Sequence, residues 1–252
     1  MAQIICIANQ KGGVGKTTTA INLSAALAVS EKMTLLIDCD PQANATSGVG
    51  IDKTGIEHSL YHGLIGKTAV ESLITDTEID SLKVIPSSVE LIGFEIEMIS
   101  NPKRNTILKT LIADIINSFE YIIIDSPPSM GLLTVNSMTA ADSLLIPLQC
   151  EFYALEGLGQ LLQTMKRIKR KLNPDLNISG ILLTMFDRRT NLSHQVVEDA
   201  IKYFKDLVFS TIIPRNVRLG EAPSYGKPII LYDAASSGAN SYMNLAKEIL
   251  TR

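Results

Sequence analysis

The octet KGGVGKTT occupies residues 11 to 18 and directly follows an apolar run from Ile4 to Ala8. An apolar strand that passes through a glycine-rich loop into a helix turns several backbone N–H groups, and the positive end of the helix dipole, toward one point in space. An anion is stabilised at that point. The octet therefore predicts a strand, loop and helix that bind the phosphates of a nucleotide.

Each residue type in the octet has a physical role. The glycines let the backbone curl around phosphate oxygens without a clash from a β-carbon. Lys16 brings a point charge to the terminal phosphates, and the hydroxyl of Thr17 is suited to Mg²⁺. The residues predicted to form this loop are Gly12, Gly13, Val14, Gly15, Lys16, Thr17 and Thr18.

The octet departs from the ordinary pattern G-x-x-x-x-G-K-[ST], which requires glycine at position 10, where this chain has Gln10. It carries instead a second lysine, Lys11. Because Lys16 already occupies the inner approach to the phosphates, Lys11 has no obvious phosphate to reach within one protomer. We expect Lys11 to reach the nucleotide of a neighbouring copy; the alternative is a solvated loop lysine.

Composition predicts one cytoplasmic domain. The chain has 252 residues, 46% of them hydrophobic and 19% charged, which is enough for one substantial core, and no linker is apparent. We expect a single domain over residues 1–252. No apolar stretch approaches the ~20 residues of a membrane span, and the N-terminus lacks the pattern of an export signal. Cys6, Cys39 and Cys150 lie in apolar runs and are expected to be buried thiols.

Charge is distributed unevenly along the chain, whose net charge is −3. Residues 1–150 hold 9 Lys and Arg against 16 Asp and Glu, whereas residues 151–252 hold 14 against 10. A basic excess late in the chain is a weak indication of a polyanionic partner, either nucleic acid or lipid.

The apolar runs predict a doubly wound α/β fold with a mostly parallel sheet and helices on both faces. Most runs are continuous rather than alternating, which is typical of parallel strands buried on both sides. Helical segments alternate with them, and ligands of such folds gather at the carboxyl ends of the strands. The expected strands are Ile4–Ala8, Met33–Ile37, Leu82–Ile85, Tyr121–Ile124, Ser143–Leu148, Ile178–Thr184 and Leu207–Ile213, and the clearest helices are 17–29, 104–118, 155–172, 192–205 and 240–250.

Two carboxylates, Asp38 and Asp40, stand at the end of the second expected strand, before Pro41. A carboxylate beside a nucleotide and Mg²⁺ can orient a water for attack on the γ-phosphate or hold the water shell of the metal. Asp40 is better placed for the water, and Asp38 is expected to support the loop or the metal shell. The alternative is a pair of turn-forming aspartates ahead of a proline.

Asp125 ends the very apolar strand of the segment YIIIDSPPSMG. A Walker B carboxylate occupies this kind of position and engages Mg²⁺ directly or through water. Because Mg²⁺ takes few protein ligands and keeps several waters, one acid, Thr17 and the phosphates suffice. A strand-end aspartate without such a role is the alternative.

Five motifs together, KGGVGKTT, DCDPQANATSG, IIIDSPPS, FDRRTN and PRNVRLGEAPSYGKP, make this chain resemble the ParA/Soj family of partition ATPases. That family lies within the wider deviant Walker A group, which includes MinD, and the resemblance spans nearly the whole chain. The first motif is shared by the wider group. TNLS near residue 190 and PRNVRLGEAPS at 214–224 are much narrower and indicate the chromosome-type Soj branch.

The resemblance implies a P-loop ATPase of the deviant Walker A type that binds ATP and Mg²⁺. Lys11 would be the signature lysine that crosses to the phosphates of the partner in an ATP-sandwich homodimer, so it would bind nucleotide and act in catalysis with Lys16 and Asp40. Asp40 would position the attacking water, and Thr17, Asp125 and Asp40 would form the metal site. A cation delivered in trans acts as an arginine finger does.

The resemblance also implies contacts to the adenine base. The turn Pro214-Arg215-Asn216 matches the base-contacting loop of the family, so Pro214 and Asn216 are expected to touch adenine. A plain strand-to-turn proline is an equally simple explanation.

Nonspecific binding of double-stranded DNA is a further implication of the resemblance. The principal expected contacts are Arg189 in FDRRTN and Arg218 in PRNVR, with a basic cluster near the end of the helix at 155–172. Basic residues at a helix C-terminus are also favourable for dipole reasons alone. Contacts to phosphate need no base-edge recognition and weaken steeply with salt. The expected DNA-binding residues are Arg189, Arg218, Lys166, Arg170 and Lys247.

The leading hypothesis is an ATP-driven switch for chromosome or plasmid partitioning. ATP closes a dimer, the dimer binds DNA on the nucleoid, and a ParB/Spo0J-type partner triggers the hydrolysis that releases it. A MinD-like membrane ATPase would need a basic amphipathic helix at the C-terminus, whereas SYMNLAKEILTR has few cations and is expected to be a docking helix. An electron-transfer ATPase like the nitrogenase iron protein would need a cysteine beside Asp125, where Ser126 stands.

Overall fold

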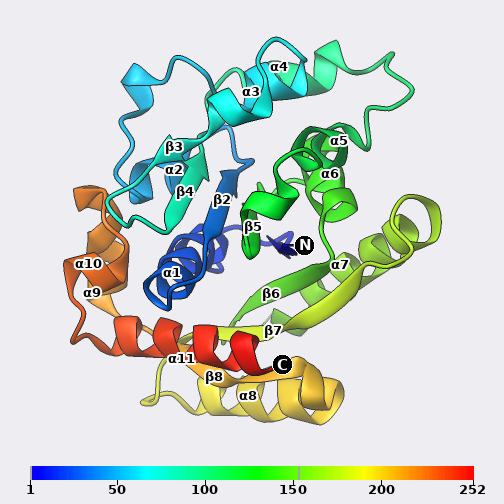
Figure 1. Cartoon of the computed structure of the whole chain (residues 1–252). Helices are drawn as coiled ribbons and strands as arrows, with labels where there is room; N and C mark the ends of the chain where they lie inside the picture. Colours follow the sequence, from blue (N-terminus) through cyan, green and yellow to red (C-terminus); the bar gives the residue numbers. More distant parts are fainter. Residues whose placement is uncertain (1, 153) are drawn as a thin grey trace.

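One eight-stranded sheet forms the centre of the molecule in the computed structural model, which describes residues 2–152 and 154–252. The strand order is β3-β4-β2-β5-β1-β6-β7-β8 (Figure 1). Neighbouring strands are parallel except β3, which pairs antiparallel with β4. The expected doubly wound α/β fold is confirmed. The strands are β1 Gln3–Ile7, β2 Thr34–Asp38, β3 Thr75–Asp76, β4 Leu82–Ile85, β5 Tyr121–Asp125, β6 Ser143–Gln149, β7 Asn177–Phe186 and β8 Val208–Pro214.

The central strands are buried on both faces, which explains their continuous apolar runs. In β1, Ile4 and Cys6 pack into one core while Ile5 and Ile7 pack into the other. Alternate side chains of a strand point to opposite faces of a sheet, so both sets are apolar only where helices cover both faces.

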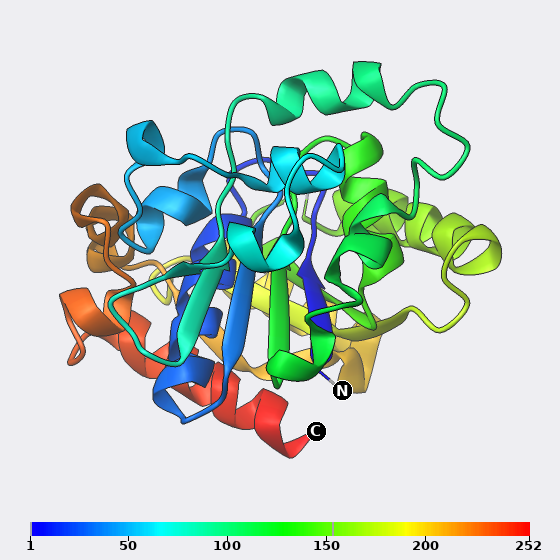
Figure 2. The same ribbon diagram turned by 45° about the horizontal axis from the view of Figure 1, so that its top comes forward.

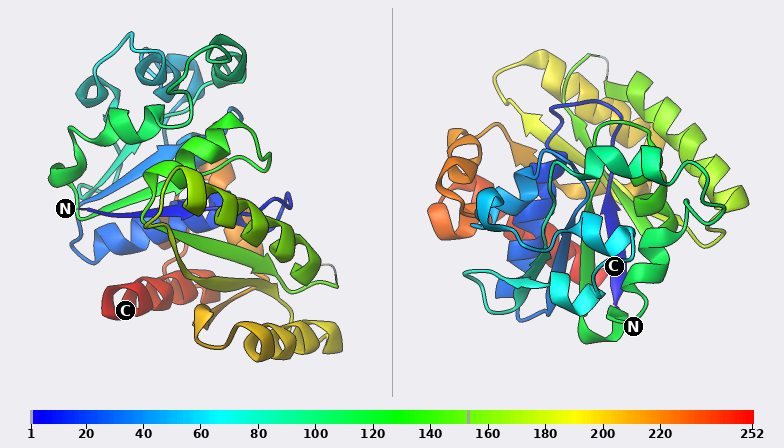
Figure 3. Two further views of the ribbon diagram at one scale, coloured as in Figure 1. Left: turned by 90° about the vertical axis from the view of Figure 1, so that its right-hand side faces the viewer. Right: turned by 90° about the horizontal axis from the view of Figure 1, so that it is seen from above.

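Two layers of helices cover the sheet, and Figure 3 views them from the side. One core contains α3 Leu60–Leu64, α4 Leu91–Glu97, α5 Ile107–Ile112, α6 Leu132–Ala140, α7 Ala154–Lys171 and α8 Asn191–Phe204. The other contains α1 Lys16–Val29, α2 Asn44–Gly48, α9 Val217–Glu221, α10 Ile229–Tyr232 and α11 Ser237–Thr251. Short 3-10 turns occur at Lys53–Gly55, Val70–Leu73, Ile116–Ser118, Lys205–Leu207 and Ala222–Tyr225. None of the described helices is long and apolar enough to span a bilayer.

The helix expected over 104–118 is wrong in extent, because α5 covers only Ile107–Ile112. The side chain of Asn136 in α6 accepts a hydrogen bond from the backbone N–H of Leu108, 3.1 Å away, and donates one to the carbonyl of Arg104, 2.8 Å away. These long-range bonds hold the chain before Ile107 outside the helix. The helix α6 was not predicted, because its apolar residues lack a helical period.

The carboxyl ends of the parallel strands meet at one edge of the sheet, which we call the carboxyl edge. The ends of β1, β2 and β5 lie there, so this edge holds the loop of the octet after β1, Asp40 after β2, and Asp125 as the last residue of β5. In Figure 2 this edge faces upward, with α4 at the outer rim. The fold therefore brings together three motifs that are far apart in the sequence.

Candidate nucleotide-binding site

The predicted phosphate loop connects β1 to α1 as expected. Gly13 and Gly15 adopt left-handed backbone angles, with φ of 73° and 89°, a conformation that other residues adopt at a cost. Gly15 is the N-cap of α1 and has no side chain to occupy the first N–H groups of the helix. These groups and the helix dipole favour an anion. A cavity of about 340 Å³ opens at this point, lined by Gly12, Gly13, Gly15, Lys16, Thr17, Thr18, Asp40, Asn44, Pro128 and Met185.

Lys16 is a buried cation at the base of this cavity. Its Nζ donates to the carbonyl oxygen of Lys11, 3.1 Å away. Burial lowers the pKa of Lys16, while the carboxyls of Asp125 and Asp40 oppose that shift. A buried ammonium group needs negative charge nearby, and the phosphates of a nucleotide would supply it.

Asp125 ends β5 and is fully buried next to Asp38 of β2. Among the described residues, neither oxygen of its carboxyl group has a hydrogen-bond partner. Burial, and next the neighbouring Asp38 carboxyl, raise the pKa of Asp125 well above its usual value. The hydroxyl of Thr17 and the charge of Lys16 oppose this shift without cancelling it. Mg²⁺ binds a hydroxyl, one carboxylate and several waters, which matches Thr17 and Asp125.

Asp38 supports the loop after β2, as expected. Its Oδ2 accepts bonds from the N–H and the hydroxyl of Thr46, at 2.8 and 2.7 Å, and its Oδ1 accepts from the N–H of Asp40 at 3.1 Å. Burial raises the pKa of Asp38 to about 6 although these bonds favour the ionised form. Asp38 therefore fixes the backbone from which Asp40 projects.

Asp40 lines the phosphate cavity and is half-buried. Its Oδ1 accepts a bond from the N–H of Gln42 at 2.9 Å, which orients the carboxyl group. Because Asp40 lines the cavity, unlike the buried Asp38, its carboxylate is accessible to a water beside the terminal phosphate.

Lys11 lies at the entrance of the loop and is not among the residues that line the phosphate cavity. Its Nζ is 3.5 Å from the carboxylate of Glu151, and the two side chains are 38% and 46% exposed. Glu151 also accepts from the amide of Gln149 and lies 3.9 Å from Arg215. Exposed pairs of this kind are worth ~0–1 kcal/mol, so Lys11 can leave Glu151 at little cost.

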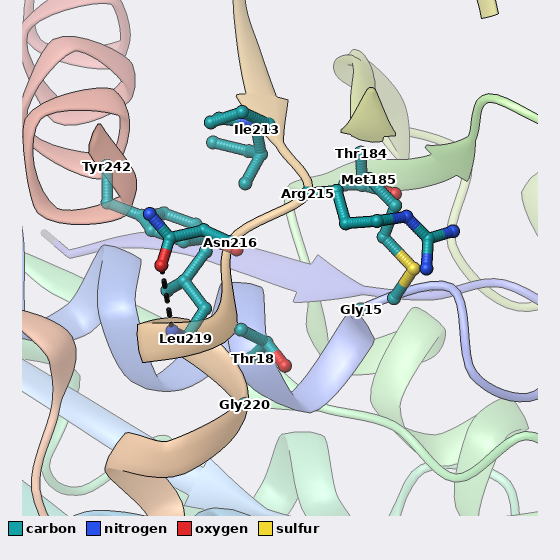
Figure 4. A pocket seen from close by; sticks show the side chains of 11 residues that line it. Gly15, Thr18, Thr184, Met185, Ile213, Arg215, Asn216, Leu219, Gly220 and Tyr242 are labelled. Atoms are coloured by element: carbon teal, nitrogen blue, oxygen red, sulfur yellow. Dashed lines mark hydrogen bonds between the residues drawn. The ribbon is translucent and has the colours of Figure 1, made fainter. Parts of the chain in front are cut away.

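A second cavity, of about 220 Å³, adjoins the first on the side of β7 and β8 (Figure 4). Pro214 and Asn216 line it, as the adenine prediction requires. The Oδ1 of Asn216 accepts from the N–H groups of Arg218 and Leu219, at 2.8 and 3.4 Å, and so caps α9. The residues that line this second cavity are Gly15, Thr18, Thr184, Met185, Ile213, Pro214, Arg215, Asn216, Leu219, Gly220 and Tyr242. Because Gly15, Thr18 and Met185 line both cavities, a triphosphate and its base can lie across them.

The residues expected to bind DNA do not form one cluster. Arg189 pairs with Asp187 in the loop that follows β7, and Arg218 in α9, just after the loop that follows β8, pairs with Glu221 and Asp233; both arginines lie at the carboxyl edge. The other three are exposed on helices away from these loops: Lys166 and Arg170 on α7 and Lys247 on α11. The neighbouring Lys169 bonds Asn177 at the amino end of β7, so the end of α7 lies at the opposite edge of the sheet.

Several residues of the site were missed by the sequence analysis. Asn44 lines the phosphate cavity and Thr46 holds Asp38, and both lie within the motif DCDPQANATSG. Glu151 follows β6 at the carboxyl edge, and that position after a strand was the available signal. Its contact with Lys11, 140 residues away, was not readable from the sequence.

Asparagine in place of Asp125 is expected to stabilise the protein when nucleotide and metal are absent. Because the folded pKa of Asp125 is raised above its unfolded value, the carboxyl favours folding while protonated and opposes it once ionised. The gain from Asp125→Asn should therefore be small at about pH 4, near the unfolded pKa of an aspartate, and grow as the pH rises to about pH 8. Thermal unfolding in EDTA at both pH values checks this. An equal shift at both would contradict it.

Comparison with known proteins agrees with this geometry. A family model described as an AAA domain matches residues 2–178. The chain is 54% identical over 252 residues to the chromosome partitioning protein ParA of Myxococcus xanthus, covering 100% of this chain and 89% of the relative. It is 55% identical over 249 residues to the sporulation initiation inhibitor protein Soj of Bacillus subtilis, covering 99% of this chain and 98% of the relative.

Solved structures give the same answer for the fold. Cobyrinic acid a,c-diamide synthase from Mycobacterium smegmatis, solved with a bound ATP analog and magnesium, has a TM-score of 0.87 at 33% identity. The match covers 99% of this chain and 95% of that chain. The identities of 54% and 55% to the ParA and Soj relatives, over nearly the whole sequence, mean that the chain belongs to the ParA/Soj family of partition ATPases.

Proposed function

We propose that this chain is a dimerising ATP switch for chromosome or plasmid partitioning. It hydrolyses ATP to ADP and phosphate with Mg²⁺, as its family membership implies. ATP closes two copies into a homodimer, the dimer binds double-stranded DNA without reading its sequence, and a ParB-type protein stimulates the hydrolysis that ends the bound state. The chain would thus be found on the nucleoid in its ATP form.

The position of Lys11 carries the proposal. Lys16 fills the inner approach to the phosphate cavity of its own protomer, whereas Lys11 lies outside that cavity in an ion pair with Glu151. A partly exposed lysine at the entrance can reach across a two-fold interface to the terminal phosphates bound by a second copy. A cation brought in this way makes hydrolysis depend on the dimer.

Other residues of the same chain bind the phosphates, hold the metal and orient the attacking water. The N–H groups of the loop and the ammonium group of Lys16 hold the phosphates, and Thr17 and Asp125 would hold Mg²⁺. When bound, Mg²⁺ neutralises charge on the terminal phosphates. Asp40, held in place by Asp38 through the backbone of the loop, would accept a hydrogen bond from the attacking water and orient it.

Alanine at both Arg189 and Arg218 is expected to weaken DNA binding without affecting dimerisation. Each arginine that contacts a phosphate contributes to a salt-dependent affinity, and losing two contacts should lower affinity roughly tenfold or more at moderate salt. Filter binding of an arbitrary duplex with ATP present measures this. The pair Lys166→Ala and Arg170→Ala, at the opposite edge of the sheet, is the comparison; a larger loss there would move the DNA surface to α7.

Contacts of α11 and of Ser126 argue against the two alternative functions, a membrane-associated ATPase and an electron-transfer ATPase. The apolar side of α11 is packed against the core that contains α1, where Tyr242 bonds Thr19 at 3.2 Å, so this helix docks on its own chain. Ser126, at the position where a cluster ligand would stand, donates to the carbonyl of Ile7 at 2.7 Å.

Light scattering tests the proposal as a whole. With ATP and Mg²⁺ the molar mass should rise from one chain to two, and with EDTA or ADP it should return to one. DNA retention should follow the dimer. A monomer under all of these conditions would contradict the switch, even if ATP binds.

A further inference from the structure

Four large apolar side chains lie exposed in a row along α4 and the turns at its ends. The exposed fractions are 67% for Val89, 60% for Ile92, 75% for Ile96 and 70% for Ile99. Their spacing of three, four and three residues places them on one side of a helix. Backbone bonds from Ile92 to Val89 and from Ile99 to Ile96 continue the helical turns beyond both ends of α4. We call these four residues the α4 stripe.

The fold does not require the α4 stripe to be apolar. The opposite side of the helix already packs Leu91 and Phe94 into the core, where both are fully buried. Single exposed apolar residues are ordinary on a protein surface, but a contiguous row indicates a surface that a partner covers. Figure 2 places α4 at the rim of the carboxyl edge, where such a partner has access.

Acidic side chains flank the stripe. Glu90, Glu95 and Glu97 are exposed, and helical geometry puts Glu95 on one side of the stripe and the other two on the opposite side. Residues 84–102 contain no lysine, arginine or histidine. Lys83 and Lys103 border this range in the sequence, and Arg104 donates to the carbonyl of Ile99 at one end of the stripe.

This charge pattern selects among occupants. DNA and anionic lipid would be repelled by the glutamates. A second copy that presented its own stripe would bring like charges together. A helix with an apolar side and flanking lysines or arginines is complementary to the stripe in shape and to the glutamates in charge. An amphipathic helix presents its apolar residues at a spacing that matches the stripe.

The helix is also connected to the loop of Asp40 and to the start of α6, the helix that follows β5 and its terminal Asp125. Ser87, just before α4, donates through Oγ to the carbonyl of Asp40 at 2.6 Å, and its N–H donates to the hydroxyl of Thr46 at 2.9 Å. Glu95 accepts a bond from the N–H of Leu132 in the segment after Asp125. A β-carbon at Gly131 would collide with that carboxylate, so the contact is close.

We infer that the α4 stripe is the docking surface for a positively charged amphipathic helix of a regulatory protein, which acts from there on the loops of Asp40 and Asp125. The inference rests on the proposed function in one respect, namely that hydrolysis is regulated by a protein partner. Docking itself needs neither nucleotide nor the dimer.

Hydrogen exchange on the intact, nucleotide-free protein tests the docking. The probe is a synthetic peptide of about 18 residues with leucines at helical spacing and lysines on the flanks, and its counterpart has glutamates in place of the lysines. The lysine peptide should slow exchange within residues 88–99, and the glutamate peptide should not. Equal protection by both peptides, or none by either, overturns the inference.

Matched variants locate the contact. Ile92→Ser with Ile96→Ser should weaken binding of the lysine peptide roughly tenfold or more, since two apolar side chains are lost from the interface. Ile201→Ser with Tyr203→Ser removes side chains that are 52% and 64% exposed on α8, and should leave binding unchanged. Protection that persists in the first pair overturns the inference.

Stimulated hydrolysis tests the action on the site. With the purified ParB-type protein, Ile92→Ser with Ile96→Ser should keep basal hydrolysis and ATP-dependent dimerisation but need roughly tenfold more partner for half-maximal stimulation. Loss of dimerisation would mean that a second copy covers the stripe, which overturns the inference. Absence of any stimulation of the native protein would instead refute the partner in the proposed function, and the peptide experiment would still decide about the stripe.

Discussion

Alanine in place of Lys11 is expected to lower ATP hydrolysis by roughly 10³- to 10⁵-fold, the range measured for arginine fingers, while each protomer still binds ATP. Lys16 and the N–H groups of the loop remain to hold the phosphates of the same protomer. The lost group is the one that a second copy would deliver to the developing charge on the transferred phosphate. Titration with a fluorescent ATP analogue and a steady-state hydrolysis assay measure the two quantities separately.

The stability of Lys11→Ala should be close to that of the native protein. The pair of Lys11 and Glu151 is exposed and spans 3.5 Å, so its loss changes the free energy of unfolding by less than ~1 kcal/mol. Lys103→Ala, at an exposed loop lysine distant from the octet in sequence, is the matched control and should hydrolyse ATP at the native rate. A Lys11→Ala rate within tenfold of native would contradict a role for this lysine in hydrolysis.

Alanine in place of Asp40 is expected to slow hydrolysis by roughly 10²- to 10⁴-fold and to trap the dimer with ATP. Asp40 lines the cavity but does not hold the fold, because its side chain bonds only the N–H of Gln42 among the described residues. ATP binding and closure should therefore survive while the water loses its orienting carboxylate. Light scattering should detect a dimer that persists long after the native dimer has returned to monomer.

The control for this variant is Asp80→Ala, which removes an exposed carboxylate outside both cavities. Its dimer should decay at the native rate. If Asp40→Ala also returned to monomer at the native rate, the water-positioning role would belong to another group, and Asp40 would be one of the turn-forming aspartates considered from the sequence.

The strands and the phosphate loop could be predicted because their signals are local. A parallel strand covered on both faces is apolar at every position, as in Tyr121–Asp125, and a glycine-rich turn between strand and helix is visible in eight consecutive residues. The antiparallel position of β3, only two residues long, and the helix α6 have no such signal. Their form depends on what packs against them.

The candidate site was predictable to the extent that its residues follow strands. Asp38, Asp40 and Asp125 were expected at the carboxyl edge and lie there. The pairing of Lys11 with Glu151 and the bonds of Thr46 to Asp38 depend on which loops face each other, and the sequence does not state that. The α4 stripe escaped notice for a similar reason, because apolar residues at helical spacing look the same whether they face the core or the solvent.

The claim that Lys11 acts on the nucleotide of the partner copy is tested most directly by mixing two inactive variants, Lys11→Ala and Asp40→Ala. In a mixed dimer, the Lys11→Ala protomer keeps its own Asp40 and receives Lys11 from its partner, so one of the two sites is complete. We predict that the mixture hydrolyses ATP although neither variant does alone. A mixture as inactive as its components, with mixed dimers demonstrated by differential labelling, would mean that the lysine serves its own protomer or none, and would contradict the account.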